Sequence, residues 1–177
     1  TITMLHELIE IYKHPKMFKF LHIPVQSGNN EVLKLMNRKY TVEDFIKIVE
    51  IFRKEMPEIT ISTDVIVGFP TETEEQFQDS MELLRKIKPD VLNLSRYASR
   101  EGTIAAKMKQ HFTNELKRRS RLMTQLFRKI SYENNKKWIG WKGKILIDEK
   151  GKFDSWIGRN EFYKPVVVNG NFKLGDE

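Results

Sequence analysis

Apolar and polar residues alternate along this chain with two periods, one typical of strands and one typical of helices. Short apolar runs predict buried strands at residues 18–25, 59–67 and 91–94. Around these runs, apolar residues recur every three or four positions and predict helices near residues 4–12, 30–36, 41–56, 73–88 and 114–135. Because strands and helices take turns, we expect right-handed βα units around a parallel sheet.

The predicted helices carry recognisable start and stop signals. Asn29 or Asn30 is a capping residue for the short helix that follows it. A capping box, formed by Thr73 with Gln76 or by Thr71 with Glu74, opens the helix near residue 73. Prolines at positions 15, 57 and 89 end the three longer helices that precede them.

The pattern changes after about residue 136. Short strands separated by glycines are predicted at residues 144–148, 156–159 and 165–169, which is typical of a small antiparallel barrel. We therefore predict two domains, residues 1–135 with an α/β fold and residues 136–177 with a β-barrel fold.

The amino-acid composition excludes several classes of function. The chain has no cysteine, which excludes disulfides, thiol catalysis and iron–sulfur or zinc sites held by its own thiolates. The four histidines show no metal-ligand spacing, so we expect them to be structural and expect no metal site. No apolar run is long enough to span a membrane and no secretory leader is visible, so we expect a cytoplasmic protein without a membrane partner.

Positive charge is concentrated in one part of the sequence. Residues 113–144 contain ten Lys and Arg residues against Glu115 and Glu133, a net charge of +8, while the rest of the chain sums to −1. Such a segment suits a polyphosphate partner, because neutralised phosphates release counterions. A solvated helix face is the alternative explanation.

Polar residues follow each of the three predicted strands. Gln26 and Ser27 come after the first strand, Ser62, Thr63 and Asp64 lie within the second, and Ser95, Tyr97 and Ser99 alternate off the third. Parallel strands deliver their carboxyl ends to one rim, where ligands bind. The Gly68–Phe69–Pro70 corner would expose main chain to something flat, such as an adenine. Ordinary turn chemistry explains any one of these stretches alone.

Three of these blocks resemble those of a known family. HIPVQSGNNEVLKLMNRKYT, STDVIVGFPTETEEQF and YASREGTIAAKM are similar to successive blocks of the methylthiotransferase family of radical S-adenosylmethionine (SAM) enzymes. The departures are Asn29 for serine, Thr71 for glycine and Ala98 for serine. GRNEFYKPVVV resembles the TRAM module that follows the radical SAM domain in this family. KYT at 39–41 and the TRAM block look most like the archaeal and eukaryotic branch, which acts on threonylcarbamoyladenosine 37 of tRNA.

The resemblance implies a fold and a reaction. The fold would be the carboxy-terminal half of a partial TIM-like (β/α) barrel, followed by the TRAM β-barrel. The reaction would use SAM and [4Fe–4S] clusters to add a methylthio group to C2 of the target adenosine. Because the cluster cysteines are missing, we expect this chain to lack an amino-terminal part of the same protein, to hold no catalytic residue and to be inactive alone. Missing strands would leave exposed edges that promote self-association.

The resemblance also implies residue roles. Gln26, Ser27 and Arg38 would contact the amino-acid or ribose part of SAM, and Ser62 and Asp64 would face the cavity. Gly68, Phe69, Pro70 and Tyr97 would contact its adenine. Two alternatives stay open: Arg38 as a surface residue at a helix end, and Asp64 as the partner of a barrel lysine or arginine.

A second set of residues is predicted to bind the tRNA anticodon loop. Phosphate contacts and base stacking are assigned to Lys136, Lys137, Lys142, Lys144, Arg159, Tyr163 and Lys164, with Trp141 or Phe162 as further stacking candidates. Trp138 and Trp156 are assigned to the core.

Three other functions compete with this one. They are a ribosomal-protein aspartate methylthiotransferase, a non-catalytic RNA-binding protein, and a TIM-barrel enzyme with a phosphorylated substrate. Positive charge favours RNA over a basic ribosomal protein.

Overall fold

The computed structural model describes residues 2–177 and groups them into two compact units. Unit 2 contains residues 22–51 and 61–137, and unit 1 contains residues up to 21 together with 52–60 and 138–177. The chain passes from unit 2 to unit 1 between Lys137 and Trp138, close to the predicted boundary at residue 136. The division into domains 1–135 and 136–177 stays a prediction.

A parallel α/β arrangement makes up most of unit 2, as the alternating pattern predicts, although residues 20–21, 52–55 and 60 of its strands and helices are grouped with unit 1. The sheet has the order β1 (Phe20–His22), β2 (Thr60–Val67), β3 (Val91–Arg96). β2 and β3 are parallel, with Ser62 opposite Val91 and Val67 opposite Arg96. The helices are α2 (Asn30–Leu35), α3 (Val42–Glu55), α4 (Glu74–Ile87) and α5 (Thr113–Asn135), and a short 3-10 turn, η1 (Ala105–Lys107), precedes α5.

The first strand is shorter than predicted, and Pro24 explains the difference. Residues 18–25 were expected to form one strand, but β1 ends at His22. Ile23 N still donates to Ser62 O over 2.9 Å, whereas Pro24 has no N–H to donate. Pairing resumes at Gln26, which forms an isolated parallel bridge with Val65.

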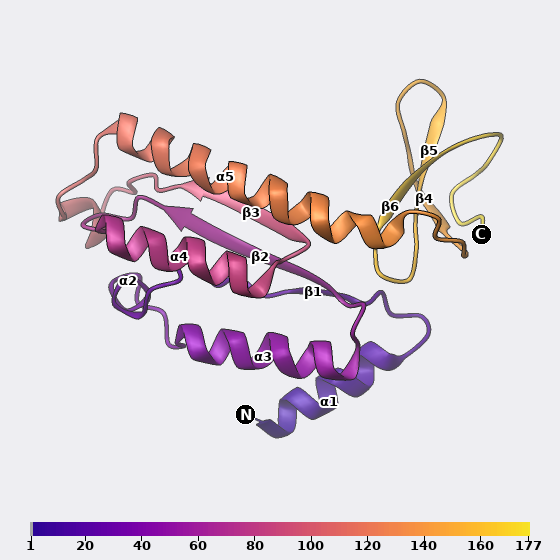
Figure 1. Cartoon of the computed structure of the whole chain (residues 1–177), viewed down its shortest axis with the longest axis horizontal. Coiled ribbons are helices and arrows are strands. Elements are labelled where there is room, and N and C mark those ends of the chain that lie inside the picture. Colours follow the sequence, from indigo (N-terminus) through magenta and orange to yellow (C-terminus); the bar gives the residue numbers. More distant parts are fainter. Residues whose placement is uncertain (1) are drawn as a thin grey trace. The chain divides into compact units, whose positions relative to one another are not determined.

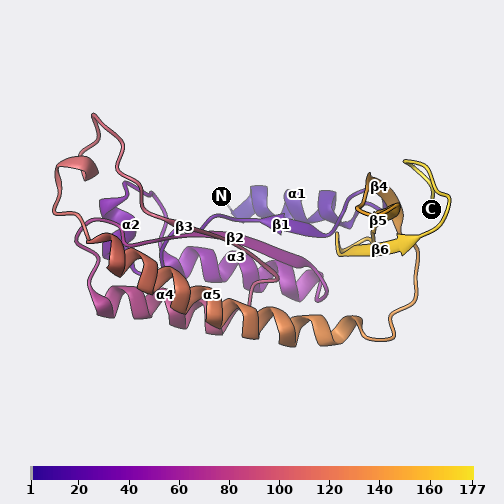
Figure 2. The same ribbon diagram turned by 90° about the horizontal axis from the view of Figure 1, so that it is seen from above.

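The helices of unit 2 cover one face of its sheet. Figures 1 and 2 show α3, α4 and α5 running along the same side of β2 and β3. The apolar stripes of these helices supply a core in which Phe45, Val49, Phe77, Leu84 and Met123 are all at most 3% exposed. Burial of these stripes leaves the other face of the sheet, with its polar side chains, available for a ligand.

Both predicted capping signals are confirmed. The Asn29 side chain accepts hydrogen bonds from Glu31 N and Val32 N at the start of α2. Thr73 and Gln76 form a complete capping box at the start of α4. A left-handed Lys88 then ends α4, and its N–H donates to Leu84 O. These local contacts fix where α2 and α4 begin, immediately after the polar exits from β1 and β2.

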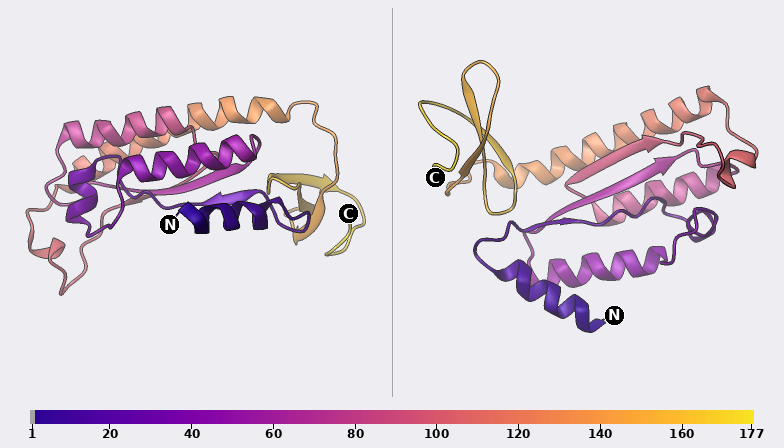
Figure 3. Two further views of the ribbon diagram at one scale, coloured as in Figure 1. Left: turned by 90° about the horizontal axis from the view of Figure 1, so that it is seen from below. Right: turned by 180° about the vertical axis from the view of Figure 1, so that it is seen from behind.

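Unit 1 contains an antiparallel sheet of three strands. The order is β4 (Leu146–Lys150), β5 (Ser155–Arg159), β6 (Pro165–Asn169), reached through a short 3-10 turn, η2 (Lys136–Trp138). Figure 3 shows this part of the chain next to the carboxyl terminus. Residues 175 and 176 add main-chain hydrogen bonds to Ile147 of β4. The antiparallel sheet is confirmed, whereas its closure into a barrel and self-association through its edges stay predictions.

The amino-terminal helix belongs to unit 1. α1 (Ile2–Lys13) packs with the end of α3, where the Tyr12 and Phe52 rings meet edge to face at 5.4 Å. Lys13 Nζ lies 2.9 Å from Glu55 Oε2. Among the described residues, no helix is long and apolar enough to cross a membrane, and no group of three or more His, Cys, Asp and Glu residues could hold a metal ion.

Candidate functional site

An open cavity of about 860 Å³ lies where β2 and β3 end. Its lining comes entirely from unit 2: Gln26 and parts of segments 35–38, 64–69 and 93–105. In Figure 1 the arrowheads of β2 and β3 point toward the end of the unit where α2 also lies. The three polar strand exits therefore meet at one cavity, as the parallel sheet predicts. Its size is typical of a pocket for a small-molecule ligand or cofactor.

Gln26 is held at the cavity in an unusual backbone conformation. Its φ of 70° lies in the left-handed region, which non-glycine residues seldom occupy. Two main-chain hydrogen bonds fix it to β2: Gln26 N to Asp64 O at 2.8 Å, and Ile66 N to Gln26 O at 2.9 Å. The sheet therefore maintains the backbone geometry that brings this side chain to the cavity.

Asp64 supplies the one carboxylate among the described residues that line the cavity. Its Oδ1 receives hydrogen bonds from Asn93 Nδ2 and lies against His22 Nε2, both at 2.8 Å. Among the described residues, the partners of Asp64 are a histidine and an amide, and the alternative of a barrel lysine or arginine partner stays open. Both contacts use the same oxygen, so the group is oriented on one side and keeps acceptor capacity for a ligand.

An aromatic pair comes from two neighbouring strand exits. The rings of Phe69, after β2, and Tyr97, after β3, meet edge to face with centroids 5.3 Å apart. Both residues line the cavity, and Tyr97 N donates to Val67 O over 2.9 Å. This main-chain bond keeps the two exits side by side. A planar ligand can pack on such a pair.

The corner after β2 is tightly constrained. Gly68 has a φ of 73°, and a Cβ on it would lie 1.9 Å from Leu116 Cδ2 of α5. Gly68 N donates to Glu72 Oε2 over 2.7 Å. The expectation that this corner exposes main-chain amides to a ligand is therefore wrong for Gly68, because the buried Glu72 carboxylate takes its amide. Thr71, where the family has glycine, adopts a φ of 68°.

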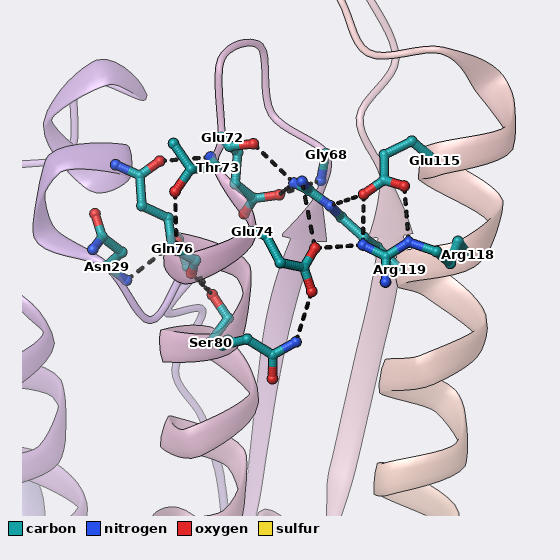
Figure 4. Close-up of polar contacts among 12 residues, drawn as sticks. Asn29, Gly68, Glu72, Thr73, Glu74, Gln76, Ser80, Glu115, Arg118 and Arg119 are labelled. Atoms are coloured by element: carbon teal, nitrogen blue, oxygen red, sulfur yellow. Dashed lines mark hydrogen bonds and ion pairs between the residues drawn. The ribbon is translucent and has the colours of Figure 1, made fainter.

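A buried ion pair joins this corner to α5 (Figure 4). Arg119 Nη1 donates to Glu72 Oε2 at 2.6 Å and to Glu72 O at 3.0 Å. The two side chains are 4% and 1% exposed. Arg119 Nε also reaches Glu115 Oε1 at 2.7 Å, and Arg118 bridges Glu115 and Glu74. Helix α5 is thus attached to the segment that carries Phe69.

The pKa values of two carboxyl groups in this network, Glu115 and Glu72, shift in opposite directions. Hydrogen bonding from the Arg118 guanidinium lowers the pKa of Glu115 to about 2. Burial raises the pKa of Glu72, and its bonds from Gly68 and Arg119 act in the other direction. Burial also lowers the pKa of nearby His111. The two carboxyl groups differ in the direction of their pKa shifts because Glu115 is partly exposed to solvent, whereas Glu72 is enclosed by protein.

Sequence reasoning assigned Arg119 only to the basic segment and missed this role. A usable signal was present, because Arg119 lies three residues after Leu116 and four before Met123, on the apolar stripe of its helix. A charged residue on a buried stripe requires a partner.

Of the predicted cofactor-binding residues, five line the cavity and four do not. Gln26, Arg38, Asp64, Phe69 and Tyr97 are on its wall. Ser27, Ser62, Gly68 and Pro70 do not line the cavity, and all four are buried. Ser27 Oγ lies 3.4 Å from Ser80 Oγ of α4. Sequence reasoning did not select Asn93, Ser95, Arg96 or Arg100, which also line the cavity.

Several predicted RNA-binding residues make ion pairs within the chain. Lys136 Nζ lies 2.8 Å from Glu133 Oε2 and 5.1 Å from the Tyr132 ring centroid. Arg159 pairs with Asp148 and Glu149. Lys144 Nζ lies 3.3 Å from Glu177 Oε2. Lys137 and Lys142 are exposed, and Lys164 is half-buried. RNA contacts by all of these stay predictions.

Tyr163, predicted to stack on a base, packs within unit 1. Its ring centroid lies 5.0 Å from that of Phe18 and 4.9 Å from that of Phe20, and the Arg159 guanidinium lies 4.8 Å from it. The surrounding loop is held by Lys19 N to Glu161 O at 2.7 Å. Thr60 Oγ1 also donates to Phe162 O, over 2.6 Å. The loop thus attaches the antiparallel strands to the segments before β1 and β2.

The tryptophans of unit 1 are half-buried. The Trp138 ring lies 6.1 Å from Trp141 and 5.8 Å from Phe162 between centroids. Trp156 lies on β5 and is also half-buried, so the two tryptophans assigned to the core are each partly exposed to solvent.

Comparisons with known proteins find similarity to radical SAM enzymes and to proteins named as tRNA methylthiotransferases. The sequence profile of the radical SAM superfamily matches residues 1–84. The "probable threonylcarbamoyladenosine tRNA methylthiotransferase" of Pyrococcus horikoshii is 55% identical over 94% of this chain and 39% of its own length. The protein of the same name from Archaeoglobus fulgidus is 47% identical over 96% of this chain and 40% of its own length. This chain therefore spans about two fifths of the length of the curated relatives it matches.

A relative with another substrate in its name matches the same span. The "tRNA-2-methylthio-N(6)-dimethylallyladenosine synthase" of Thermotoga petrophila is 38% identical over 93% of this chain and 38% of its own length. Among solved structures, an archaeal Elp3 from Methanocaldococcus infernus, lacking residues 1–46, has a TM-score of 0.52. The match covers 86% of this chain and 49% of that one at 14% identity, which supports the fold alone.

Proposed function

We propose that this chain, which belongs to the methylthiotransferase family of radical SAM enzymes, forms part of the cofactor pocket and tRNA-binding surface of a tRNA methylthiotransferase. The proposed reaction adds a methylthio group to C2 of threonylcarbamoyladenosine at position 37. The observation that supports it most directly is the meeting of three strand exits at one cavity. Because tRNA is the proposed substrate, we expect the reaction to take place in the cytoplasm.

The residues of the cavity fit SAM. Arg38 offers a guanidinium for the carboxylate of the cofactor, Asp64 and Gln26 offer acceptors for ribose hydroxyls, and the Phe69–Tyr97 pair offers an apolar surface for adenine. Ser27, Ser62, Gly68 and Pro70 would act behind this wall, by fixing its main chain. When bound, SAM would supply the methyl group that this family transfers.

The residues of this chain do not fit an iron–sulfur cluster. Such clusters are held by cysteine thiolates, and the sequence has no cysteine. We therefore assign no step of the reaction to a cluster on these residues. The contribution that we propose for this chain is to bind and orient cofactor and substrate.

The residues proposed to contact RNA belong to two sets, one at the end of α5 in unit 2 and one in unit 1, and each set is considered by itself. Lys136, Lys137, Lys142, Lys144, Arg159 and Lys164 would contact phosphates of the anticodon loop. Several of these make ion pairs in the chain, so RNA would have to exchange with the carboxylates of Glu133, Asp148 and Glu149. Tyr163 would act by holding the loop of Arg159 and Lys164 in place.

Binding measurements test the proposal directly. The chain is titrated with SAM by calorimetry, and with a tRNA anticodon stem–loop at about 0.05 M and 0.2 M salt. We expect SAM binding, and RNA binding that weakens steeply with salt. Asp64→Asn should weaken SAM binding by about tenfold, because a charged acceptor becomes a neutral one. Glu82→Gln, on the exposed face of α4, is the matched control.

Two outcomes favour other functions. Salt-insensitive or absent RNA binding, with SAM binding retained, favours a methylthiotransferase that acts on a ribosomal protein. RNA binding without any SAM binding favours a non-catalytic RNA-binding protein.

A further inference from the structure

The segment that carries Phe69 is a closed corner, residues 68–72. Its two ends are joined by two hydrogen bonds: Gly68 N donates to Glu72 Oε2 over 2.7 Å, and Glu72 N donates to Phe69 O over 3.0 Å. Gly68 and Thr71 both have left-handed backbone conformations, with φ of 73° and 68°. For a residue with a branched side chain such as Thr71, this conformation is unfavourable and persists only where the surroundings impose it. The corner therefore depends on contacts from outside it.

Helix α5 supplies these contacts. Arg119 Nη1 donates to the main-chain oxygen of Glu72 over 3.0 Å and to its Oε2 over 2.6 Å. Three residues earlier on the helix, the Leu116 side chain fills the space beside Gly68, where a Cβ would lie 1.9 Å from Leu116 Cδ2. The Arg119 guanidinium also lies 5.4 Å from the centroid of the Phe77 ring of α4. Arg119 thus fixes the end of the corner, while Leu116 packs against its start.

Arg119 itself does not reach the cavity. Phe69 is among the residues that line it and Arg119 is not, and the Arg119 side chain is buried. Phe69 is 5% exposed, and its ring meets that of Tyr97 edge to face. Because protein encloses the Phe69 ring except where it borders the cavity, the position of the ring follows the main chain of the corner. The physical connection between Arg119 and a ligand is therefore the corner.

We infer that Arg119 is a positioning residue for the adenine end of the cavity: through Glu72 it holds the corner in the conformation that places the Phe69 ring beside Tyr97. This inference rests on the proposed function, which assigns that aromatic pair to the adenine of SAM. A pair of rings packs well on a flat ligand only in a favourable relative orientation. A wall that is already ordered also spares the ligand the cost of ordering it. Loss of the Arg119 contacts should therefore weaken the binding of ligands that carry adenine.

A cycle of two substitutions tests this inference on the dissociation constant of SAM, measured by calorimetry. The variants are Arg119→Lys, Phe69→Leu and the two together. Lysine keeps the positive charge beside Glu72 but lacks the planar set of donors that a guanidinium offers. The matched control is Arg118→Lys, which alters the neighbouring, partly exposed ion pairs.

A second variant carries the test if Arg119→Lys does not fold. Glu72→Gln keeps a side-chain acceptor for the Gly68 amide and removes the negative charge that Arg119 faces. Circular dichroism verifies that each variant is folded. The whole series is repeated with 5′-methylthioadenosine, which has the adenine and ribose of SAM without its amino acid.

We expect Arg119→Lys to raise the dissociation constant of SAM about three- to tenfold, and Phe69→Leu to have an effect of similar size. When Phe69→Leu is already present, Arg119→Lys should change the constant by less than about twofold, because the ring through which Arg119 acts is missing. 5′-Methylthioadenosine should give the same pattern, and Glu72→Gln should resemble Arg119→Lys. Arg118→Lys should leave both dissociation constants unchanged. A purely structural role for Arg119 would instead weaken binding equally with and without Phe69→Leu.

Two results would overturn the inference while the proposed function stands. The first is an unchanged dissociation constant of SAM in the folded Arg119→Lys or Glu72→Gln variant. The second is that equal loss in the presence and absence of Phe69→Leu, which assigns Arg119 to general stability. Failure of the unsubstituted chain to bind SAM would reject the proposed function, and this inference with it.

Discussion

Arg119 of α5 holds Glu72 through two hydrogen bonds from one nitrogen, to the main-chain oxygen and to Oε2. The same Oε2 accepts a hydrogen bond from the amide of Gly68, so the carboxylate of Glu72, forty-seven residues before Arg119, connects α5 to the end of β2. Phe69 lies between Gly68 and Glu72, and its ring is on the wall of the cavity. The position of that ring therefore depends on a contact that no ligand touches.

Arg119→Met should destabilise the chain strongly. Removal of one member of a buried ion pair leaves an uncompensated charge and costs about 3–5 kcal/mol. Arg118→Met is the matched control, since its partly exposed pairs contribute about 0.2–1 kcal/mol. Urea unfolding monitored by circular dichroism gives both values. Equal losses in the two variants would show that the Glu72–Arg119 pair has no special contribution.

Gly68→Ala should be more harmful than Gly102→Ala. Both glycines have positive φ, 73° and 80°, so both substitutions introduce similar backbone strain. Only at Gly68 does the new Cβ meet a neighbour, Leu116, which adds about 1–3 kcal/mol for overpacking. The free energy of unfolding is the quantity to compare.

A second substitution separates strain from crowding. Adding Leu116→Ala to Gly68→Ala should recover part of the loss, because it removes the atoms that the new Cβ meets. If the double variant is less stable by the full sum of the two single changes, crowding against α5 is not the cause.

Thr71→Gly should leave the chain as stable as before or stabilise it by up to about 1 kcal/mol, because glycine adopts a φ of 68° without the penalty of a Cβ. The gain is limited because glycine also has more freedom in the unfolded chain. Thr73→Gly, two residues later, removes the side chain that forms the capping box. It should lower the thermal stability and is measured in the same thermal unfolding series for contrast. A clear loss of stability in Thr71→Gly would mean that the Thr71 side chain makes a contribution larger than the strain.

Acid should weaken the network through Glu115. Its pKa in the folded chain is lowered to about 2, so its contribution to stability is complete above its ordinary pKa and disappears as the pH falls toward 2. The difference in unfolding free energy between the chain and Glu115→Gln should shrink as the pH falls from about 6 to about 3. A difference independent of pH would contradict the assignment.

The contribution of Glu72 to stability is expected to change with pH in the opposite direction. Because burial raises its pKa, its protonated form is favoured in the folded chain, and its contribution declines as the pH rises through that raised value. The two carboxylates thus partly offset each other in acid, and single substitutions are needed to separate them.

Local features of the sequence predicted local features of the structure. Asn29 caps α2 and Thr73 pairs with Gln76 because the groups involved are at most three residues apart, so the sequence contains the whole interaction. The helical stripes predicted α3 and α4 for the same reason. The strand exits could be placed on one rim because parallel βα topology fixes where carboxyl ends lie.

Contacts between distant residues were not predictable in this way. The contacts of Glu72 with Arg119, of Ser27 with Ser80 and of Tyr163 with Phe18 form only when the elements that carry these residues pack together. Each of these residues has a plausible local role in the sequence, as a helix-start acid, a ligand contact or a stacking ring. In the folded chain, each of these residues instead contacts a partner on a remote element. The periodicity of the sequence carries no information about such partners.

Every residue on the wall of the cavity lies between positions 26 and 105, within unit 2. The strands from residue 146 onward contribute none of them. We therefore expect that exchanging residues 138–177 between relatives leaves the lining of the cavity unchanged, provided that the contacts of Tyr163 with Phe18 and Phe20 are kept. Chimaeras of this kind would separate the choice of RNA from the choice of small molecule.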